Sequence, residues 1–377
     1  MKTRYSRREF IRTCAACGLG LAAGARIACA QRAAPIKNQA ASLKEAFFWE
    51  ALADGRTRCT TCPNGCVSAE GGITRCRTRI NRGGKLYTMT YGKPCVIYMD
   101  SLEKNPLYHV APGHNALATA TAGCNLYCHY CQNWEISQVG PDKTKNMDIS
   151  PEALIAEARE RGLKWLTFSY TEPVAYYEYA VDAARLARRQ GLKVAMVTAG
   201  FINPKPLNQL IEVSDAFSIT LKGYTASFYK DICGGTLEDV WRCIKTVAKS
   251  GKWMEVVTLV VPGLNDEESG LRSIARSLAQ LNPDIPLHFL RLAPAYKLKL
   301  IPSTPLRTLE KARDAARREG LHFVYLSNLP GHAGANTYCP ACSKLLVEQV
   351  GFKILNNRVV NQHCPACGHK IPGLDWT

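Results

Sequence analysis

The sequence predicts an α/β fold in which parallel strands alternate with helices, as in a barrel or an open doubly wound sheet. Between residues 115 and 326, short apolar runs rich in β-branched residues alternate with amphipathic segments. This alternation predicts right-handed strand–helix–strand crossovers and therefore a parallel sheet. Cysteine-rich segments lie on both sides of the region, so we expect a central domain with two smaller additions among the 377 residues.

The predicted strands of the central region are residues 115–121, 165–170, 193–198, 216–221, 253–261, 287–292 and 323–326. Helices are expected between them, for example over 151–161 and 174–190, where Pro151 and Pro173 mark the starts. The predicted boundaries are 1–30 for an export leader, 31–114 for a cysteine-rich segment, 115–328 for the core and 329–377 for a terminal cysteine-rich unit.

Composition excludes several classes of protein. With 46% apolar and 21% charged residues, the chain does not have the composition of a disordered protein. No apolar run reaches the roughly 18 residues that a spanning helix needs, so we predict no transmembrane segment. The formal net charge is +17, yet no basic run is interleaved with stacking aromatics, so we predict no nucleic-acid partner.

The first 30 residues resemble a twin-arginine export leader. Arg7 and Arg8 precede a weakly hydrophobic stretch, and Ala28-Cys29-Ala30 provides a small-x-small cleavage site. The resemblance implies export to the periplasm or another extracytoplasmic compartment. The alternative is a basic tail before a short core helix in a cytoplasmic protein.

Three cysteines lie within eight positions directly after the first predicted core strand. Cys124, Cys128 and Cys131 are separated by three and then two residues, which suits three corners of a cubane cluster whose fourth iron stays open. Zinc prefers four protein ligands in a structural site. A zinc site completed by His129, or cysteines that simply pack in a loop, are the alternatives.

Here the sequence resembles the radical S-adenosylmethionine (SAM) superfamily, whose signature is Cys-x3-Cys-x2-Cys with an aromatic residue before the third cysteine, in this chain Tyr130. The resemblance implies a partial (βα)6-type TIM barrel and a 4Fe-4S cluster on the three cysteines, with SAM bound at the open iron. It also implies a low-potential electron donor, because an electron from the reduced cluster splits SAM to yield a 5′-deoxyadenosyl radical that abstracts hydrogen from a substrate.

Three further segments at the ends of predicted strands match the superfamily, where barrel active sites lie. The resemblance implies that Glu172, in Ser169-Tyr170-Thr171-Glu172-Pro173, accepts a hydrogen bond from the SAM amino group. It assigns Thr198 to the ribose and Lys222 to the SAM carboxylate, and Tyr130 is counted with this SAM-binding set. The loop Val261–Asp266 matches a segment that lies near the cofactor in activase-like members.

Near the C-terminus, two Cys-Pro-x-Cys knuckles predict a rubredoxin-like zinc ribbon. They comprise Cys339, Cys342, Cys364 and Cys367, and 21 residues separate the pairs. Since all four positions would be filled by protein, we expect a structural site. Two disulfides are the alternative in an exported chain.

The N-terminal quartet Cys59, Cys62, Cys66 and Cys76 is less specific. A second iron–sulfur cluster, a zinc site and vestigial loop cysteines are all open on sequence grounds. Three single cysteines, Cys95, Cys233 and Cys243, have no metal partner by spacing, and we expect them to be small buried hydrophobes.

Within the superfamily, the segments Asp100–His109 and Cys131–Gln138 look like the radical-SAM member of the AmmeMemoRadiSam system, a branch close to pyruvate formate-lyase activating enzymes. That resemblance implies Memo-type and AMMECR-type partner proteins and leaves the reaction unassigned. A glycyl-radical-enzyme activase is a narrower alternative, and a non-enzymatic iron–sulfur electron carrier is an alternative of another class. The side chains of His109, His114, His288 and Arg291 are candidates to shape a substrate pocket, although a structural role is the better expectation for any single histidine.

Overall fold

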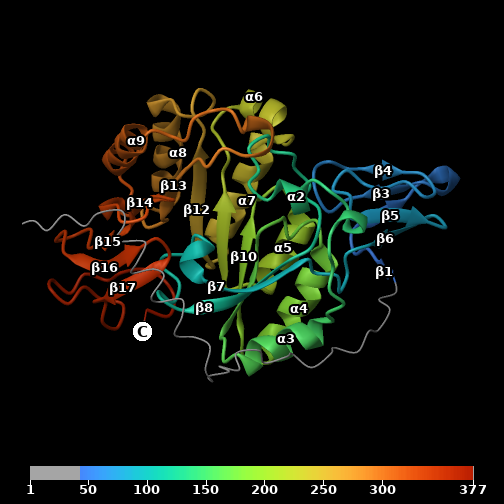
Figure 1. Cartoon of the computed structure of the whole chain (residues 1–377), viewed down its shortest axis with the longest axis horizontal. Coiled ribbons are helices and arrows are strands. Elements are labelled where there is room, and N and C mark those ends of the chain that lie inside the picture. Colours follow the sequence, from blue (N-terminus) through green and yellow to red (C-terminus); the bar gives the residue numbers. More distant parts are fainter. Residues whose placement is uncertain (1–42, 377) are drawn as a thin grey trace, which may run out of the picture. The chain divides into compact units, whose positions relative to one another are not determined.

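The computed structural model describes residues 43–376, so the predicted export leader lies outside the described residues. An eight-stranded sheet forms its centre, with the strand order β14-β13-β12-β11-β10-β9-β8-β7 (Figure 1). Its strands are β7 Val96–Ser101, β8 Asn115–Ala120, β9 Trp165–Phe168, β10 Lys193–Thr198, β11 Ala216–Thr220, β12 Trp253–Val260, β13 Leu287–Arg291 and β14 Val324–Ser327. From β8 to β14 all neighbours are parallel, whereas β7 pairs antiparallel with β8.

Helices connect the parallel strands, as the alternating pattern predicts. They are α2 Trp134–Ser137, α3 Pro151–Glu160, α4 Tyr177–Arg189, α5 Pro204–Glu212, α6 Ala226–Phe228, α7 Leu237–Lys249, α8 Glu268–Leu281 and α9 Leu306–Arg318. The strands between them are almost wholly buried, and the largest apolar cluster fills the space between strands and helices. Hydrophobic burial on both faces explains why these strands read as continuous apolar runs rather than as alternating ones. No helix of the described chain is long and apolar enough to cross a bilayer.

Two features differ from the sequence prediction. The central sheet begins at Val96, one antiparallel strand before the predicted start of the core at 115, because β7 pairs with β8 over six residue pairs. Helix α4 begins at Tyr177 rather than at 174. There, the carbonyl of Glu172 accepts the N–H of Ala175 and the Glu172 carboxylate accepts the N–H of Val174, so the turn before the helix positions Glu172.

Smaller sheets flank the core (Figure 1). The N-terminal segment forms one sheet from β1 Lys44–Glu45, β6 Lys85–Thr88 and β5 Arg79–Arg82, and another from β2 Trp49–Ala51, β3 Thr57–Cys59 and β4 Val67–Ser68. The C-terminal segment forms a third sheet from β15 Thr337–Tyr338, β16 Leu345–Val350 and β17 Lys353–Asn357. Short 3-10 helices are η1 Ala53–Gly55, η2 Leu102–Lys104, η3 Pro141–Lys143, η5 Tyr296–Leu298 and η6 Ala333–Ala335, and η4 Tyr229–Cys233 is a π-helix.

Candidate active site

The three cysteines of the central triplet line one cavity of about 400 Å³. Cys124, Cys128 and Cys131 lie in the loop after β8, at the carboxyl end of the strand where ligands bind in parallel α/β folds. None of the three forms a disulfide. Their Sγ atoms are not all within 4.8 Å of one another, a limit met in the described chain only by the C-terminal quartet. Three sulfurs that each bind a different iron of a cubane are expected to lie farther apart than this limit.

The loop is held by a segment that sequence reasoning did not identify. Tyr127 N–H donates to the carbonyl of Cys233 at 2.9 Å, and His129 N–H donates to the carbonyl of Ile232 at 3.0 Å. A β-carbon at Gly234 would lie 2.1 Å from the Tyr127 ring, so the loop packs directly on this glycine. The adjacent pair Gly234-Gly235 after Cys233 was the available sequence signal, because paired glycines often allow close approach of another chain segment.

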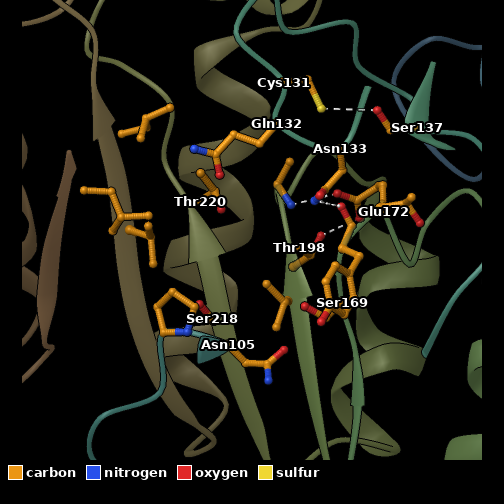
Figure 2. A pocket seen from close by; sticks show the side chains of 18 of the residues that line it. Asn105, Cys131, Gln132, Asn133, Ser137, Ser169, Glu172, Thr198, Ser218 and Thr220 are labelled. Carbon is orange, nitrogen blue, oxygen red and sulfur yellow. Dashed lines mark hydrogen bonds between the residues drawn. The ribbon is translucent and has the colours of Figure 1, made fainter. Parts of the chain in front are cut away.

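Glu172 is buried in the cavity wall and held by three donors. Its carboxylate accepts the Thr198 hydroxyl at 2.6 Å, the Ala199 N–H at 2.8 Å and the Val174 N–H at 3.3 Å. Burial raises the pKa of this carboxyl above its ordinary value, and these hydrogen bonds oppose the rise. The network fixes the orientation of Glu172, and Figure 2 shows Glu172 beside Thr198.

Lys222 reaches the same cavity from the end of β11. Burial alone would lower the pKa of its ammonium, but the nearby sulfurs of Cys128 and Cys233 raise it above its usual value. The backbone of this residue is held on both sides: its N–H donates to the Tyr229 hydroxyl at 2.9 Å, and its carbonyl accepts the Asn265 amide at 2.8 Å. Asn265, from the predicted loop Val261–Asp266, therefore acts behind the cavity and does not line it.

Tyr130 and Cys233 lie together behind the triplet. The Tyr130 hydroxyl is 3.6 Å from Cys233 Sγ, and both side chains are buried. A hydrogen bond from Cys233 lowers the pKa of the Cys128 thiol below its usual value despite its burial. Tyr130 lines the cavity, whereas Cys233 is absent from its lining. Cys233 is buried as predicted, yet it contacts the triplet, which the spacing analysis did not anticipate.

The far end of the cavity is polar and buried. Asn105 and Ser218 lie there, opposite the cysteine loop (Figure 2), and Glu103 also lines the cavity. Ser218 Oγ and Glu103 Oε2 have no hydrogen-bond partner among the described residues. Since buried polar atoms normally find a partner, these two atoms fit a cavity that receives a polar ligand. Together with three thiols, a carboxylate and an ammonium, the residues present fit an iron–sulfur cluster and SAM.

Exposed side chains form the rim of this cavity. Lys104, Gln132, Asn328 and Phe352 line it and are exposed to solvent. Lys104 Nζ donates to Asp100 at 2.7 Å and to the Tyr170 hydroxyl at 3.0 Å, so the rim also holds an ion pair. The cavity is therefore open to solvent on one side.

The histidine and arginine side chains suggested as pocket residues lie elsewhere. His288 Nε2 is 2.7 Å from the Glu255 carboxylate, and His109 is held by Tyr325 at 2.6 Å and by the Pro372 carbonyl at 2.7 Å. Neither these two residues nor His114 and Arg291 line the cavity. A buried hydrogen-bonded network explains both buried histidines, in line with the structural role expected for them.

The C-terminal quartet converges. Cys339 Sγ is 3.6 Å from Cys367 Sγ, Cys342 Sγ is 3.7 Å from Cys364 Sγ, and all four sulfurs lie within 4.8 Å of one another. A tetrahedral metal with bonds of about 2.3 Å to sulfur places the sulfurs about 3.8 Å apart, so the geometry suits one metal ion. No disulfide joins the four cysteines.

The N-terminal quartet comes together less tightly. Cys59, Cys62 and Cys76 are buried and Cys66 is half-buried. Burial raises the pKa of the Cys62 thiol to about 12, and the nearby sulfurs of Cys59 and Cys76 contribute to the rise. Their sulfurs do not meet the 4.8 Å limit that the C-terminal quartet meets.

Comparison with known proteins places the chain in a family. Residues 119–271 match the radical SAM superfamily. The uncharacterized protein MJ0808 of Methanocaldococcus jannaschii is 42% identical over 332 residues, which cover 87% of this chain and 99% of that protein. The pyruvate formate-lyase-activating enzyme of Clostridium pasteurianum is 27% identical over 222 residues, which cover 55% of this chain and 88% of the enzyme. The protein belongs to the radical SAM superfamily and is homologous to pyruvate formate-lyase-activating enzymes.

Solved structures give a weaker likeness. The crystal structure of Streptococcus suis SuiB bound to the precursor peptide SuiA is 14% identical, with a TM-score of 0.45 over 60% of this chain and 51% of SuiB.

Proposed function

We propose that this protein is an enzyme that cleaves SAM at a 4Fe-4S cluster held by Cys124, Cys128 and Cys131 and removes a hydrogen atom from a substrate in the adjoining cavity. One observation carries the proposal: the three thiols, Glu172 and Lys222 all line the same cavity. When bound, the cluster supplies the electron that splits SAM into methionine and a 5′-deoxyadenosyl radical.

The side chains have distinct roles in this proposal. Glu172, oriented by three donors, accepts a hydrogen bond from the SAM amino group, and the Lys222 ammonium pairs with the SAM carboxylate. Thr198 lines the wall beside Glu172 and meets the ribose, and Tyr130 closes the wall behind the cysteines. The buried floor excludes bulk water from the radical and holds the substrate in one orientation.

A non-enzymatic electron carrier is less well supported. Carriers bind every iron with protein sulfur and need no ligand cavity. Here a cavity of about 400 Å³ adjoins the three cysteines and contains a buried carboxylate and ammonium. The arrangement therefore favours catalysis.

The decisive experiment is reductive SAM cleavage. The reconstituted and reduced protein should form 5′-deoxyadenosine, and Cys128→Ala should abolish it. Cys95→Ser, which alters a cysteine outside the cavity lining, is the matched control and should keep the activity. Unchanged cleavage by Cys128→Ala would remove the cluster assignment.

A protein substrate is the second candidate. The exposed rim formed by Lys104, Gln132, Asn328 and Phe352 leaves the cavity open to a peptide segment whose remainder stays outside. Relatives named as activating enzymes are consistent with such a role. Transfer of deuterium from a labelled candidate to deoxyadenosine identifies the donor: label from a partner protein supports an activase, whereas label from a small molecule argues against it.

We further propose that the protein is part of the AmmeMemoRadiSam system and acts with Memo-type and AMMECR-type proteins. The support is the likeness of Asp100–His109 and Cys131–Gln138 to that branch. Asp100, Glu103, Lys104 and Asn105 from the first segment line the cavity, so this likeness extends to the site itself. Affinity purification of the tagged chain should recover both partner types, and the absence of both would contradict the assignment.

Export by the twin-arginine route is also a proposal, and it implies a low-potential electron donor that is reachable outside the cytoplasm. Its support is the sequence around Arg7 and Arg8. Changing both residues to Lys should retain the protein in the cytoplasmic fraction. Equal fractionation of variant and wild type would indicate that this segment is not an export signal.

A further inference from the structure

The four N-terminal cysteines lie on adjoining loops of the two small sheets. Cys59 ends β3, and its N–H donates to the carbonyl of Cys66 at 2.9 Å. The N–H of Arg75, next to Cys76 in the chain, donates to Cys66 Sγ at 3.4 Å. These contacts bring together cysteines that are up to 17 positions apart in the sequence.

A hydroxyl and a guanidinium face the sulfur of Cys76. Thr74 Oγ1 lies 3.1 Å from Cys76 Sγ, and the guanidinium Nη1 of Arg79 lies 3.8 Å from it. A packed neutral thiol is a weak acceptor and needs neither group. Donors directed at sulfur instead stabilise thiolates and are one of the features that set the potential of an iron–sulfur centre.

Arg79 adds a buried positive charge at this position. Its side chain is 2% exposed, and Arg79 Nη2 pairs with the fully buried Glu178 at 3.1 Å. The Nε of Arg79 has no hydrogen-bond partner among the described residues. Glu178 already balances this buried charge, and metal-bound thiolates at Cys76 would be a second anionic partner for the same guanidinium.

The spacing of the sulfurs distinguishes this quartet from the C-terminal one. Within residues 43–376, only Cys339, Cys342, Cys364 and Cys367 meet the 4.8 Å limit that suits one tetrahedral ion. Neither the N-terminal quartet nor the triplet Cys124, Cys128 and Cys131 meets this limit. In a polynuclear cluster each sulfur binds a different iron, so the ligand sulfurs lie farther apart than around a single zinc ion.

The quartet lies directly behind the triplet loop. A β-carbon at Gly123 would be 2.5 Å from the Cys76 carbonyl oxygen. Asn64 Nδ2 donates to the Asn125 carbonyl at 2.8 Å, and the Arg75 guanidinium lies 4.5 Å from the centre of the Tyr127 ring. Residues 123, 125 and 127 thus contact the N-terminal segment, while the cysteines of the same loop line the cavity.

From these contacts we infer that Cys59, Cys62, Cys66 and Cys76 bind a second iron–sulfur cluster, which stores one electron beside the SAM site. A ferredoxin- or flavodoxin-type donor gives this cluster one electron, and the cluster returns to its oxidised state when the same electron moves to the iron held by the triplet. No bond forms or breaks in the transfer. The storage role rests on the proposed function, whereas the metal site stands independently.

The metal site is tested in a chain that lacks the first cluster. The triple variant Cys124→Ala, Cys128→Ala, Cys131→Ala, reconstituted with iron and sulfide, should retain both and give a paramagnetic signal on reduction that SAM does not alter. Adding Cys76→Ser should remove the iron, whereas adding Cys95→Ser, the matched control, should not. Iron content in the triple variant no higher than in the Cys76→Ser quadruple variant would overturn the inference.

A milder variant keeps every cysteine of the quartet and does not depend on the folding of the Cys76→Ser chain. Thr74→Val in the triple-variant background removes the hydroxyl that faces Cys76 Sγ and could donate a hydrogen bond to a metal-bound thiolate. The iron content should stay the same, and the midpoint potential should become more negative because a hydrogen bond to sulfur favours the reduced cluster. An unchanged potential would argue that no cluster is bound at Cys76.

Electron storage is tested by counting turnovers. The protein with an intact triplet is reduced with dithionite, freed of reductant and mixed with excess SAM. The wild type and Cys95→Ser store one electron on each of two clusters and should form up to two molecules of 5′-deoxyadenosine per chain. Cys76→Ser lacks the second cluster and should form at most one. If the wild type forms only one 5′-deoxyadenosine per chain, the storage role is overturned. A wild type that forms none argues against the proposed function and leaves the iron result of the triple variant intact.

Discussion

Gly123 lies against the carbonyl oxygen of Cys76. A β-carbon at Gly123 would be 2.5 Å from that oxygen and 2.3 Å from Cγ2 of Thr78, both closer than real β-carbons approach other atoms. Gly123 immediately precedes the cysteine triplet and has a φ of +92°. The N-terminal segment and the loop that carries the cysteine triplet are therefore packed together at a position that only glycine can occupy.

Gly123→Ala should destabilise the protein by about 2–4 kcal/mol, because the new methyl group meets backbone atoms and the positive φ is unfavourable for alanine. Gly191 provides a matched control: its φ is +81°, and a β-carbon added there would have no other atom within 4 Å. Gly191→Ala should therefore cost only about 1 kcal/mol. Thermal and urea unfolding measure both values, and equal costs would contradict the close contact.

Glu172→Ala should weaken SAM binding by about 10- to 100-fold, since a hydrogen bond to a charged group contributes roughly 1.5–3 kcal/mol. Iron content should stay near that of the wild type, because Glu172 is not a cluster ligand. Equilibrium binding of SAM and iron analysis provide the measurements. Glu160→Ala, on the exposed end of α3, is the control. Loss of iron in Glu172→Ala would mean that the residue is structural.

Glu103 should make stability depend on pH. Burial raises the pKa of its carboxyl from 4.5 to about 7, so the folded state holds a proton that the unfolded state releases. The stability of the wild type should fall by up to about 3 kcal/mol as pH rises from about 4.5 to about 7 and then level off. The Glu103→Gln side chain cannot ionise, so the free energy of unfolding of this variant should lack the fall between about pH 4.5 and about pH 7. Urea unfolding at several pH values gives the difference between the two proteins, and a difference independent of pH would contradict the expected titration.

Cys339→Ser should release the metal of the C-terminal quartet and lower the stability of the β15–β17 unit, while the spectrum of the 4Fe-4S cluster stays unchanged. The four sulfurs surround one point, so removal of one ligand weakens the whole site. Metal analysis should find zinc in the wild type and less of it in the variant. Lys344→Ala, an exposed change in the same knuckle, should retain the metal. A changed cluster spectrum would show that the C-terminal quartet is not a separate site.

Much of the fold could be predicted from sequence because parallel strands buried on both faces have a distinct pattern. All seven predicted core strands are present with ends within a few residues, for example Lys193–Thr198. The antiparallel strand Val96–Ser101 was not predicted, because its short apolar run, Val96–Met99, precedes the region in which strands and helices alternate. Pairing with β8 makes this segment part of the central sheet.

The candidate site was predictable to a similar extent. Glu172, Thr198 and Lys222 were identified from segments at strand ends, and all three line the cavity with the triplet. Cys233 and Gly234 were not assigned to the site, because they lie about 100 positions from the cysteines and only the fold brings them to Tyr127 and Tyr130. Glu103 was likewise inconspicuous, since its role depends on burial and not on local sequence.

By itself, the sequence determined the kinds of ligand-bearing side chains and their grouping into quartet, triplet and quartet, because short spacings along a chain restrict which sulfurs can meet. Only the tertiary structure decided how closely the sulfurs of each group approach one another. Packing brings the C-terminal sulfurs within 4.8 Å of one another, keeps the other two groups wider, and sets Cys76 against Gly123. These distances depend on contacts between segments far apart in sequence, which no local pattern encodes.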